Sequence, residues 1–204
     1  LIMRDGAPTI SLHEARHLSR RILIFMLISE AIGALILAAE FYRDSDGVLH
    51  ALWYGLFHSV SAFCNAGFDL QGDFESLYGF RDETFIDVTI MSLIQLGSLS
   101  FVFFADLWDK RDNFGLRRFR PRRGWARLNL DTKLIFVTNY VLIAVGAMSF
   151  AIIEWSSALA TIPQTHNKVM ASVFQSVSAR TAGFATIAYV DAHQSTLFIW
   201  IGLM

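Results

Sequence analysis

The chain has 204 residues, of which 54% are hydrophobic and only 17% are charged, whereas a soluble domain averages about 25% charged residues. Its formal net charge of −1 argues against nucleic acid as a partner, and its mean hydropathy of +0.44 favours a membrane protein. Its single cysteine, Cys64, excludes an intrachain disulfide.

Three stretches are apolar and long enough to cross a bilayer. They are residues 22–39, 85–107 and 134–153. At about 1.5 Å per helical residue, each reaches across a hydrocarbon core of about 30 Å. A lead-in over 1–21 precedes the first span. The final run 197–204 is too short to cross and is interpreted as the first half of a further span, so we expect the chain to be an internal fragment of a longer protein.

The basic residues predict how the spans are oriented. Most of the 17 Lys and Arg lie in the lead-in 1–21 and in the loop 109–133. Lysine and arginine are retained on the cytoplasmic side of a membrane, so we expect both segments to be cytoplasmic, with 40–84 and 154–196 on the opposite side. The retention of basic residues in the cytoplasm is by itself enough to explain the loop 109–133. The alternative is that this loop also contacts a cytosolic regulator or anionic lipid headgroups.

Each outer segment contains a moderately apolar stretch that is too short to span and that ends near a glycine. The letters are ALWYGLFHSVSAFCNAGF in the first and VMASVFQSVSARTAGF in the second. Such lengths are typical of re-entrant segments, and non-helical backbone at membrane depth is tolerated only where it is buried in protein or lines a water-filled cavity. We predict pore helices at about 52–63 and 169–179, followed by filter loops at about 64–69 and 180–185.

The two outer stretches match each other. The letters FHSVSA and AGF of the first align with FQSVSA and AGF of the second, with one residue fewer between them in the second copy. Both copies fall at the same place in the predicted topology, which indicates an internal duplication with units 22–108 and 134–204. A duplicated pair of surface loops is the alternative, although surface loops need no apolar pore-helix stretch.

The sequences SAFCNAGFDL and SVSARTAGF resemble the second and third pore loops of the Trk/Ktr/HKT superfamily of potassium transporters. The letters ARTAGF are most similar to the Ktr B-type membrane subunit. This resemblance implies an all-α integral membrane protein in which four M1–pore loop–M2 repeats surround a pseudo-fourfold cation pathway. Units 22–108 and 134–204 would be the second and third repeats, the third being truncated in its M2. Cys64 stands where the family pattern leads us to expect asparagine or another small polar residue.

A potassium filter replaces the hydration shell of the ion with backbone carbonyl oxygens, and glycine gives that backbone the freedom it needs. The C-terminal ends of the pore helices carry partial negative charge and would face the cation. Because the resemblance implies one filter glycine per loop, we expect weaker discrimination between K⁺ and Na⁺ than in a tetrameric channel. The candidate ion-pathway residues are Asn65, Ala66, Gly67, Phe68, Thr181, Ala182, Gly183 and Phe184.

Two charged residues fall at membrane depth in this scheme. An unpaired buried charge is costly, so Arg180 must point away from the pore and be paired. We hypothesise that it supports the filter from behind by holding the loop against its own repeat. Glu30, in the middle of the first span, is either a functional residue or part of an interhelical hydrogen bond.

The resemblance implies that the protein takes up K⁺ across the cytoplasmic (inner) membrane, passively or linked to Na⁺, as a multi-pass transporter and not an enzyme. No organic cofactor is expected in this chain. The implied partners are membrane lipid, a second copy in a homodimer with one pore per subunit, and a cytosolic nucleotide-binding ring as regulator. A gating loop just beyond Met204 is also implied.

Two other classes remain open. His13, Glu14 and His17 match H-E-x-x-H, which on a helix places two histidines on one face to bind zinc and provides a glutamate base. A membrane-embedded zinc metalloprotease is therefore one alternative, although no third ligand is evident. A non-conducting membrane scaffold subunit is the other. Measurement of bound zinc and of cation flux would separate the three classes.

Overall fold

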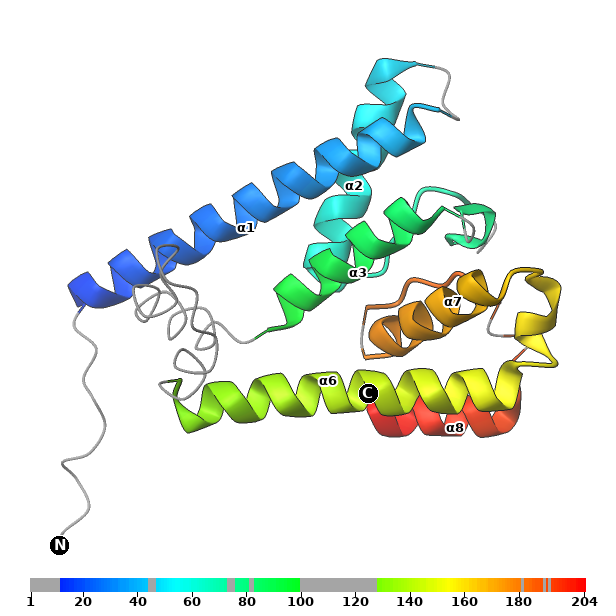
Figure 1. Cartoon of the computed structure of the whole chain (residues 1–204). Helices are drawn as coiled ribbons and strands as arrows, with labels where there is room; N and C mark the ends of the chain where they lie inside the picture. Colours follow the sequence, from blue (N-terminus) through cyan, green and yellow to red (C-terminus); the bar gives the residue numbers. More distant parts are fainter. Residues whose placement is uncertain are drawn as a thin grey trace, which may run out of the picture.

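The computed structural model describes residues 12–43, 47–72, 76–80, 83–99, 128–180, 182–188, 190 and 192–204. Within these ranges every regular element is a helix (Figure 1), which confirms the predicted all-α class. In chain order the elements are α1 (Leu12–Phe41), α2 (Val48–Phe63), η1 (Tyr78–Phe80), α3 (Thr84–Ser98), α6 (Leu130–Glu154), η3 (Ala158–Thr161), α7 (Thr165–Ser178) and α8 (Gln194–Leu203).

The helices form two groups that follow one plan. In the first group, the short helix α2 and the following helix α3 pack against the long helix α1. In the second group, α7 and α8 pack in the same way against the long helix α6 (Figure 1). Helix α3 also contacts α7, and this contact joins the two groups. This contact brings together residues that are far apart in the sequence.

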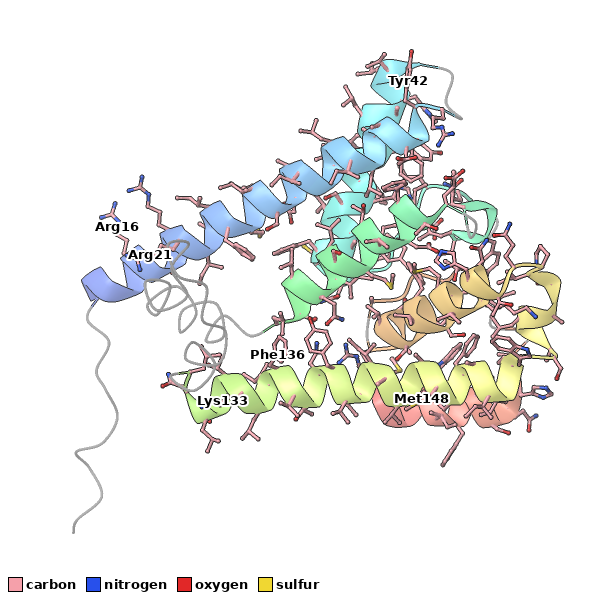
Figure 2. All side chains as sticks on the ribbon, in the orientation of Figure 1. Arg16, Arg21, Tyr42, Lys133, Phe136 and Met148 are labelled. Carbon is pink, nitrogen blue, oxygen red and sulfur yellow. The ribbon has the colours of Figure 1, made fainter. Side chains whose placement is uncertain are left out.

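Two helices are long and apolar enough to cross a membrane, namely Ser19–Phe41 within α1 and Leu130–Glu154, which is α6. The core helix of a soluble protein can pass the same test, but such a helix is mostly buried. Most side chains of these two helices instead lie on the surface of the structure (Figure 2). The exposed aliphatic residues include Leu27, Ile28, Leu35, Val137, Val141, Val145 and Ile152. A surface of this kind is suited to contact with lipid or with further apolar helices.

Helix α3 is shorter than the apolar stretch 85–107 from which it was predicted. It ends at Ser98, and Leu99 takes an extended conformation with φ −68° and ψ 130°. Near this end, an added Cβ on Gly97 would collide with the main-chain carbonyl of Phe63 at the end of α2. Glycine is required for this close contact, and it is a poor helix former. The predicted helix over 85–107 is thus interrupted at Leu99. Residues 100–107 lie outside the described ranges.

The main buried apolar cluster joins α1, α2, α3 and α7 and includes the start of the loop that follows α7. Ile94 on α3 and Val177 on α7 belong to this cluster, together with Phe184 from the loop. A second cluster joins α6 to α8, where the rings of Phe150 and Trp200 stack with their centroids 5.3 Å apart. The loop after α7 is thus held by the same packing that brings the two helix groups together.

Candidate functional site

Both short helices end in a turn that leads directly to the repeated A-G-F letters. After α2, the amide of Ala66 donates to the carbonyl oxygen of Ser61 at 2.9 Å, and the half-buried Asn65 takes a positive φ of 51°. After α7, the amide of Ala182 donates to the carbonyl oxygen of Ser178 at 3.0 Å. In each copy the main chain therefore reverses at the C-terminal end of the helix, where the helix dipole is negative.

The first serine of each repeated S-V-S run connects the short helix to the long helix of its own group. Ser59 Oγ donates to the carbonyl oxygen of Glu30 on α1 at 2.7 Å, and Ser176 Oγ donates to that of Ile143 on α6 at 2.8 Å. A glycine on each long helix lies directly beside the hydroxyl. This pair of equivalent bonds places α2 on α1 in the same way as α7 on α6.

The second serine of each run holds the loop that follows the helix. Ser61 Oγ donates to the carbonyl oxygen of Phe68 at 2.7 Å, and Ser178 Oγ donates to that of Phe184. The sequence analysis did not select these serines, although the repeat contained the signal. Their residue type is conserved between the two copies because each hydroxyl satisfies a backbone carbonyl of the loop.

The two candidate filter glycines lie against each other. Gly67 and Gly183 both have positive φ values, 69° and 83°, which favour glycine because it has no Cβ. A Cβ added to Gly67 would collide with the carbonyl oxygen of Ala182 and lie 2.6 Å from the Cα of Gly183. A Cβ added to Gly183 would lie 3.1 Å from the Cα of Gly67. The loops of the two groups therefore meet at their glycines.

The other candidate ion-pathway residues do not share one environment. Ala66 and Phe68 are exposed, whereas Ala182 and Phe184 are fully buried. Thr181 lies outside the described residues. We call the loop after α2 the second loop and the loop after α7 the third loop, following the resemblance. The structure thus brings the two glycines together. It places one side of the third loop in the protein core, while the second loop presents its side chains to the surface.

A pair of hydrogen bonds connects the end of the third loop to the segment after the second. The amide of Leu77 donates to the carbonyl oxygen of Ala185 at 2.9 Å. The amide of Ala185 in turn donates to Ser76 Oγ at 3.1 Å. Both loops are therefore fixed to each other beyond the glycines as well as at them.

Arg180 lies between the end of α7 and the third loop and is half-buried. Its Nη1 donates to Asn139 Oδ1 on α6 at 2.7 Å, and Asn139 Nδ2 donates to Gln95 Oε1 on α3 at 2.7 Å. These three residues line a cavity of about 300 Å³, together with Ser98 and Met204 among others. The hypothesised contact with the arginine's own repeat is present as a hydrogen bond to α6, and its partner is a neutral amide.

The H-E-x-x-H segment forms the first turns of α1. The side chains of His13, Glu14 and His17 fall outside what the structure describes. Among the described residues, no group of three or more His, Cys, Asp or Glu side chains is placed to hold a metal ion. Glu30 is buried, and its main-chain carbonyl accepts the interhelical bond from Ser59.

Glu154, which the sequence analysis missed, connects α6 to α8. This fully buried carboxylate accepts a hydrogen bond from the amide of His193 at 2.8 Å and another from Thr196 Oγ1. Both donors lie at the start of α8, His193 as its N-cap residue and Thr196 in its first turn, where unpaired amides and the positive end of the helix dipole favour an anion. A carboxylate at the end of one helix and a Thr in the first turn of the next were the available signals.

Two groups of helices, each with a long apolar helix and a short helix that turns at a glycine, define an all-α protein of two similar halves whose exposed apolar helices suit a membrane. Residues 4–204 match the family model TrkH, a cation transport protein. Since this match covers nearly the whole chain, the chain belongs to the TrkH family. The membership inferred from the two loop sequences is confirmed.

Three relatives are identical to this chain at about a third of the aligned positions. Ktr system potassium uptake protein B of Vibrio alginolyticus is 33% identical over 93% of this chain and 39% of its own length. Ktr system potassium uptake protein D of Bacillus subtilis is 32% identical over 92% of this chain and 39% of its own length. Potassium/sodium uptake protein NtpJ of Enterococcus hirae is 31% identical over 90% of this chain and 37% of its own length.

The chain therefore spans about two fifths of the length of these relatives. All three are uptake proteins and none is an enzyme. The family does not support the metalloprotease alternative, and membership of a cation transport family places the chain in a membrane.

Proposed function

We propose that this chain forms the second and third of four repeats in a K⁺ uptake transporter, with Gly67 and Gly183 at the ion pathway. The observation that carries the proposal is the meeting of these glycines from two helix groups, at the ends of two short helices. The printed names of the relatives, which are potassium uptake proteins, support K⁺ as the transported ion.

The residues of this chain would act mainly by holding main-chain carbonyl groups in place. Ser61 and Ser178 fix the carbonyl groups that follow the two glycines. Because Gly67 and Gly183 have no side chains, the two loops can approach each other. A dehydrating cation requires a complete ring of oxygen ligands. The first and fourth repeats would contribute the remaining ligands in this proposal.

The proposed orientation places the starts of α1 and α6 in the cytoplasm. Both helices begin on the same side of the structure (Figure 1). Arg16 and Arg21 lie near the start of α1, and Lys133 lies near the start of α6 (Figure 2). Because basic residues are retained on the cytoplasmic side, this arrangement supports cytoplasmic positions for 1–21 and 109–133. Residues 1–11 and 109–127 lie outside the described ranges.

Three finer features belong to the same proposal. Linkage to Na⁺ is supported by the printed name of the potassium/sodium uptake protein NtpJ. Lipid contact is supported by the exposed apolar side chains of α1 and α6. A homodimer and a cytosolic nucleotide-binding ring follow from the family resemblance alone.

The proposal is tested by cation uptake in cells that lack their own K⁺ uptake systems. The full-length protein should restore K⁺ uptake, and Gly67→Ala should abolish it, because the added Cβ collides with the third loop. Gly79→Ala is the matched control, since an added Cβ there meets nothing within 4 Å. A wild-type protein that reaches the membrane and carries no cation would favour the scaffold alternative and refute the transporter.

A further inference from the structure

Behind the paired glycines, a chain of polar side chains crosses from one repeat to the other. Arg180 has only donors, so the oxygen of Asn139 must face it. The amide nitrogen of Asn139 then points to α3, and Gln95 must present its own oxygen to that nitrogen. The two distances of 2.7 Å agree with this single assignment. The direction of all the bonds is therefore fixed by the arginine.

Both ends of this polar chain lie next to a glycine loop. Arg180 directly precedes the third loop. Gln95 lies two residues before Gly97, whose Cα sits against the carbonyl of Phe63 at the end of α2. Residue 63 in turn leads into the second loop within the same turn. The two loops are thus connected directly at their glycines and indirectly through the side chains of Arg180, Asn139 and Gln95.

The charge of Arg180 is held without an acidic partner among the described residues. The one salt bridge found there joins Arg43 to Glu40 at 3.5 Å, on the surface. The negative end of the α7 dipole lies beside Arg180 and offsets part of its charge. A hydrogen bond from a charged donor is stronger than one between neutral groups. The bond to Asn139 is therefore the principal restraint on the arginine.

The second repeat has no equivalent cation. The letters before its glycine are AFCNAG, whereas the third repeat has ARTAG. A single arginine thus lies beside the pair of loops. It donates to Asn139 of the third repeat, which in turn donates to Gln95 of the second. An arginine that only secured its own loop would need no connection to α3.

We propose that Arg180, Asn139 and Gln95 are positioning residues that set the separation of the two glycine loops and so the preference for K⁺ over Na⁺. This inference rests on the proposed function and deepens it. Ligand sites must hold their geometry to within about 0.5 Å, and selectivity between two monovalent cations depends on the spacing and stiffness of the carbonyl groups. Breaking the hydrogen bonds among Arg180, Asn139 and Gln95 changes the spacing of the loops and leaves the carbonyl groups themselves intact.

The test measures K⁺ and Na⁺ uptake by the full-length transporter in reconstituted vesicles and compares their ratio. Asn139→Ala, Gln95→Ala and Arg180→Gln should each lower the K⁺/Na⁺ ratio about tenfold, the change that 1.4 kcal/mol produces. Asn139→Leu keeps the side-chain size but removes both the acceptor for Arg180 and the donor to Gln95, so it should lower the ratio as Gln95→Ala does. The double variant of Asn139 and Gln95 should lower it no further than either single variant.

Two exposed neighbours provide matched controls. Thr138→Ala lies beside Asn139 on α6, and Ser92→Ala lies one turn before Gln95 on α3, where its hydroxyl bonds only its own helix at Val88. Both should keep the wild-type ratio. The proposal is overturned if Asn139→Leu and Gln95→Ala keep that ratio, or if they lower the uptake of both ions equally. A wild-type protein without any cation uptake would instead refute the proposed function.

Discussion

The second and third loops have the same main-chain connections and different surroundings. In both copies a serine fixes the carbonyl of the phenylalanine that follows the glycine. Phe184 is fully buried, whereas Phe68 is 69% exposed. The ring of Phe184 lies 6.3 Å from that of His58 on α2, measured between centroids. The third loop thus rests on the short helix of the preceding repeat, and the second loop has no such support in the described structure.

The residues that hold the far end of each loop also differ. The hydroxyl of Tyr54 donates to the carbonyl oxygen of Leu70 at 3.0 Å, and Gln175 Nε2 donates to that of Ile187 at 3.1 Å. Gln175 occupies the position that His58 has in the second repeat, and His58 Nδ1 bonds the carbonyl of Tyr54 at 2.8 Å. The repeated motif therefore fixes the start of each loop, while the far end of each loop is held by a residue that differs between the two repeats.

The largest expected effect tests the difference between the two phenylalanines. Phe184→Ala should destabilise the protein by about 3–5 kcal/mol, because it empties a fully buried site. In the proposed four-repeat arrangement, Phe68 rests on the first repeat as Phe184 rests on the second, so Phe68→Ala should cost a similar amount in the full-length protein. Thermal unfolding in detergent measures both. If Phe68→Ala changes stability by less than about 0.5 kcal/mol, as at an exposed site, the four-repeat arrangement is contradicted.

Smaller losses are expected at the two loop serines. Ser178→Ala removes a donor from a buried carbonyl and should cost about 1–3 kcal/mol. Ser61→Ala removes the same donor from the second loop, which the first repeat covers in the proposed four-repeat protein, and should cost a similar amount. Thermal unfolding and K⁺ uptake, with Ser92→Ala as control, measure both losses. A loss at Ser61 far below that at Ser178 would show that water reaches the second loop in the assembled protein, against the four-repeat arrangement.

The smallest effect is expected at Cys64, at the start of the second loop. Its side chain is exposed, so Cys64→Asn, which restores the residue type expected from the family, should change stability by less than about 0.5 kcal/mol. Uptake of K⁺ should also remain near the wild-type rate. A loss of uptake in a protein of normal stability would mean that residue 64 contributes to the ion pathway directly.

The sequence predicted the helices well where apolar length was decisive. The range 52–63 falls within α2, and 134–153 falls within α6. The stretch 85–107 was predicted as one helix because its apolar letters continue past Gly97, whereas α3 ends at Ser98 and residues 100–107 lie outside the described ranges. Hydropathy averages over a window and does not register a single backbone contact with another helix.

The glycines of the candidate site could be found from the repeat, but the partners of Arg180 could not. Asn139 lies in a long apolar span that carries no charge, and Gln95 lies in another span far away in the sequence. Their connection depends on the packing of α3 beside α6 and α7, which is a tertiary property. The same is true of Glu154, whose donors lie beyond the intervening helix α7.

The bonds between Ala185 and the segment at Ser76 have a consequence for biosynthesis. The two residues are separated by 109 positions, and a ribosome adds about 5–20 residues per second. The segment around Ser76 must therefore wait roughly 5 to 20 s for its partner to be made. Translation rate sets a lower limit on the time needed to complete the junction between the loops. A pause between the two repeats would lengthen this interval without altering the finished structure.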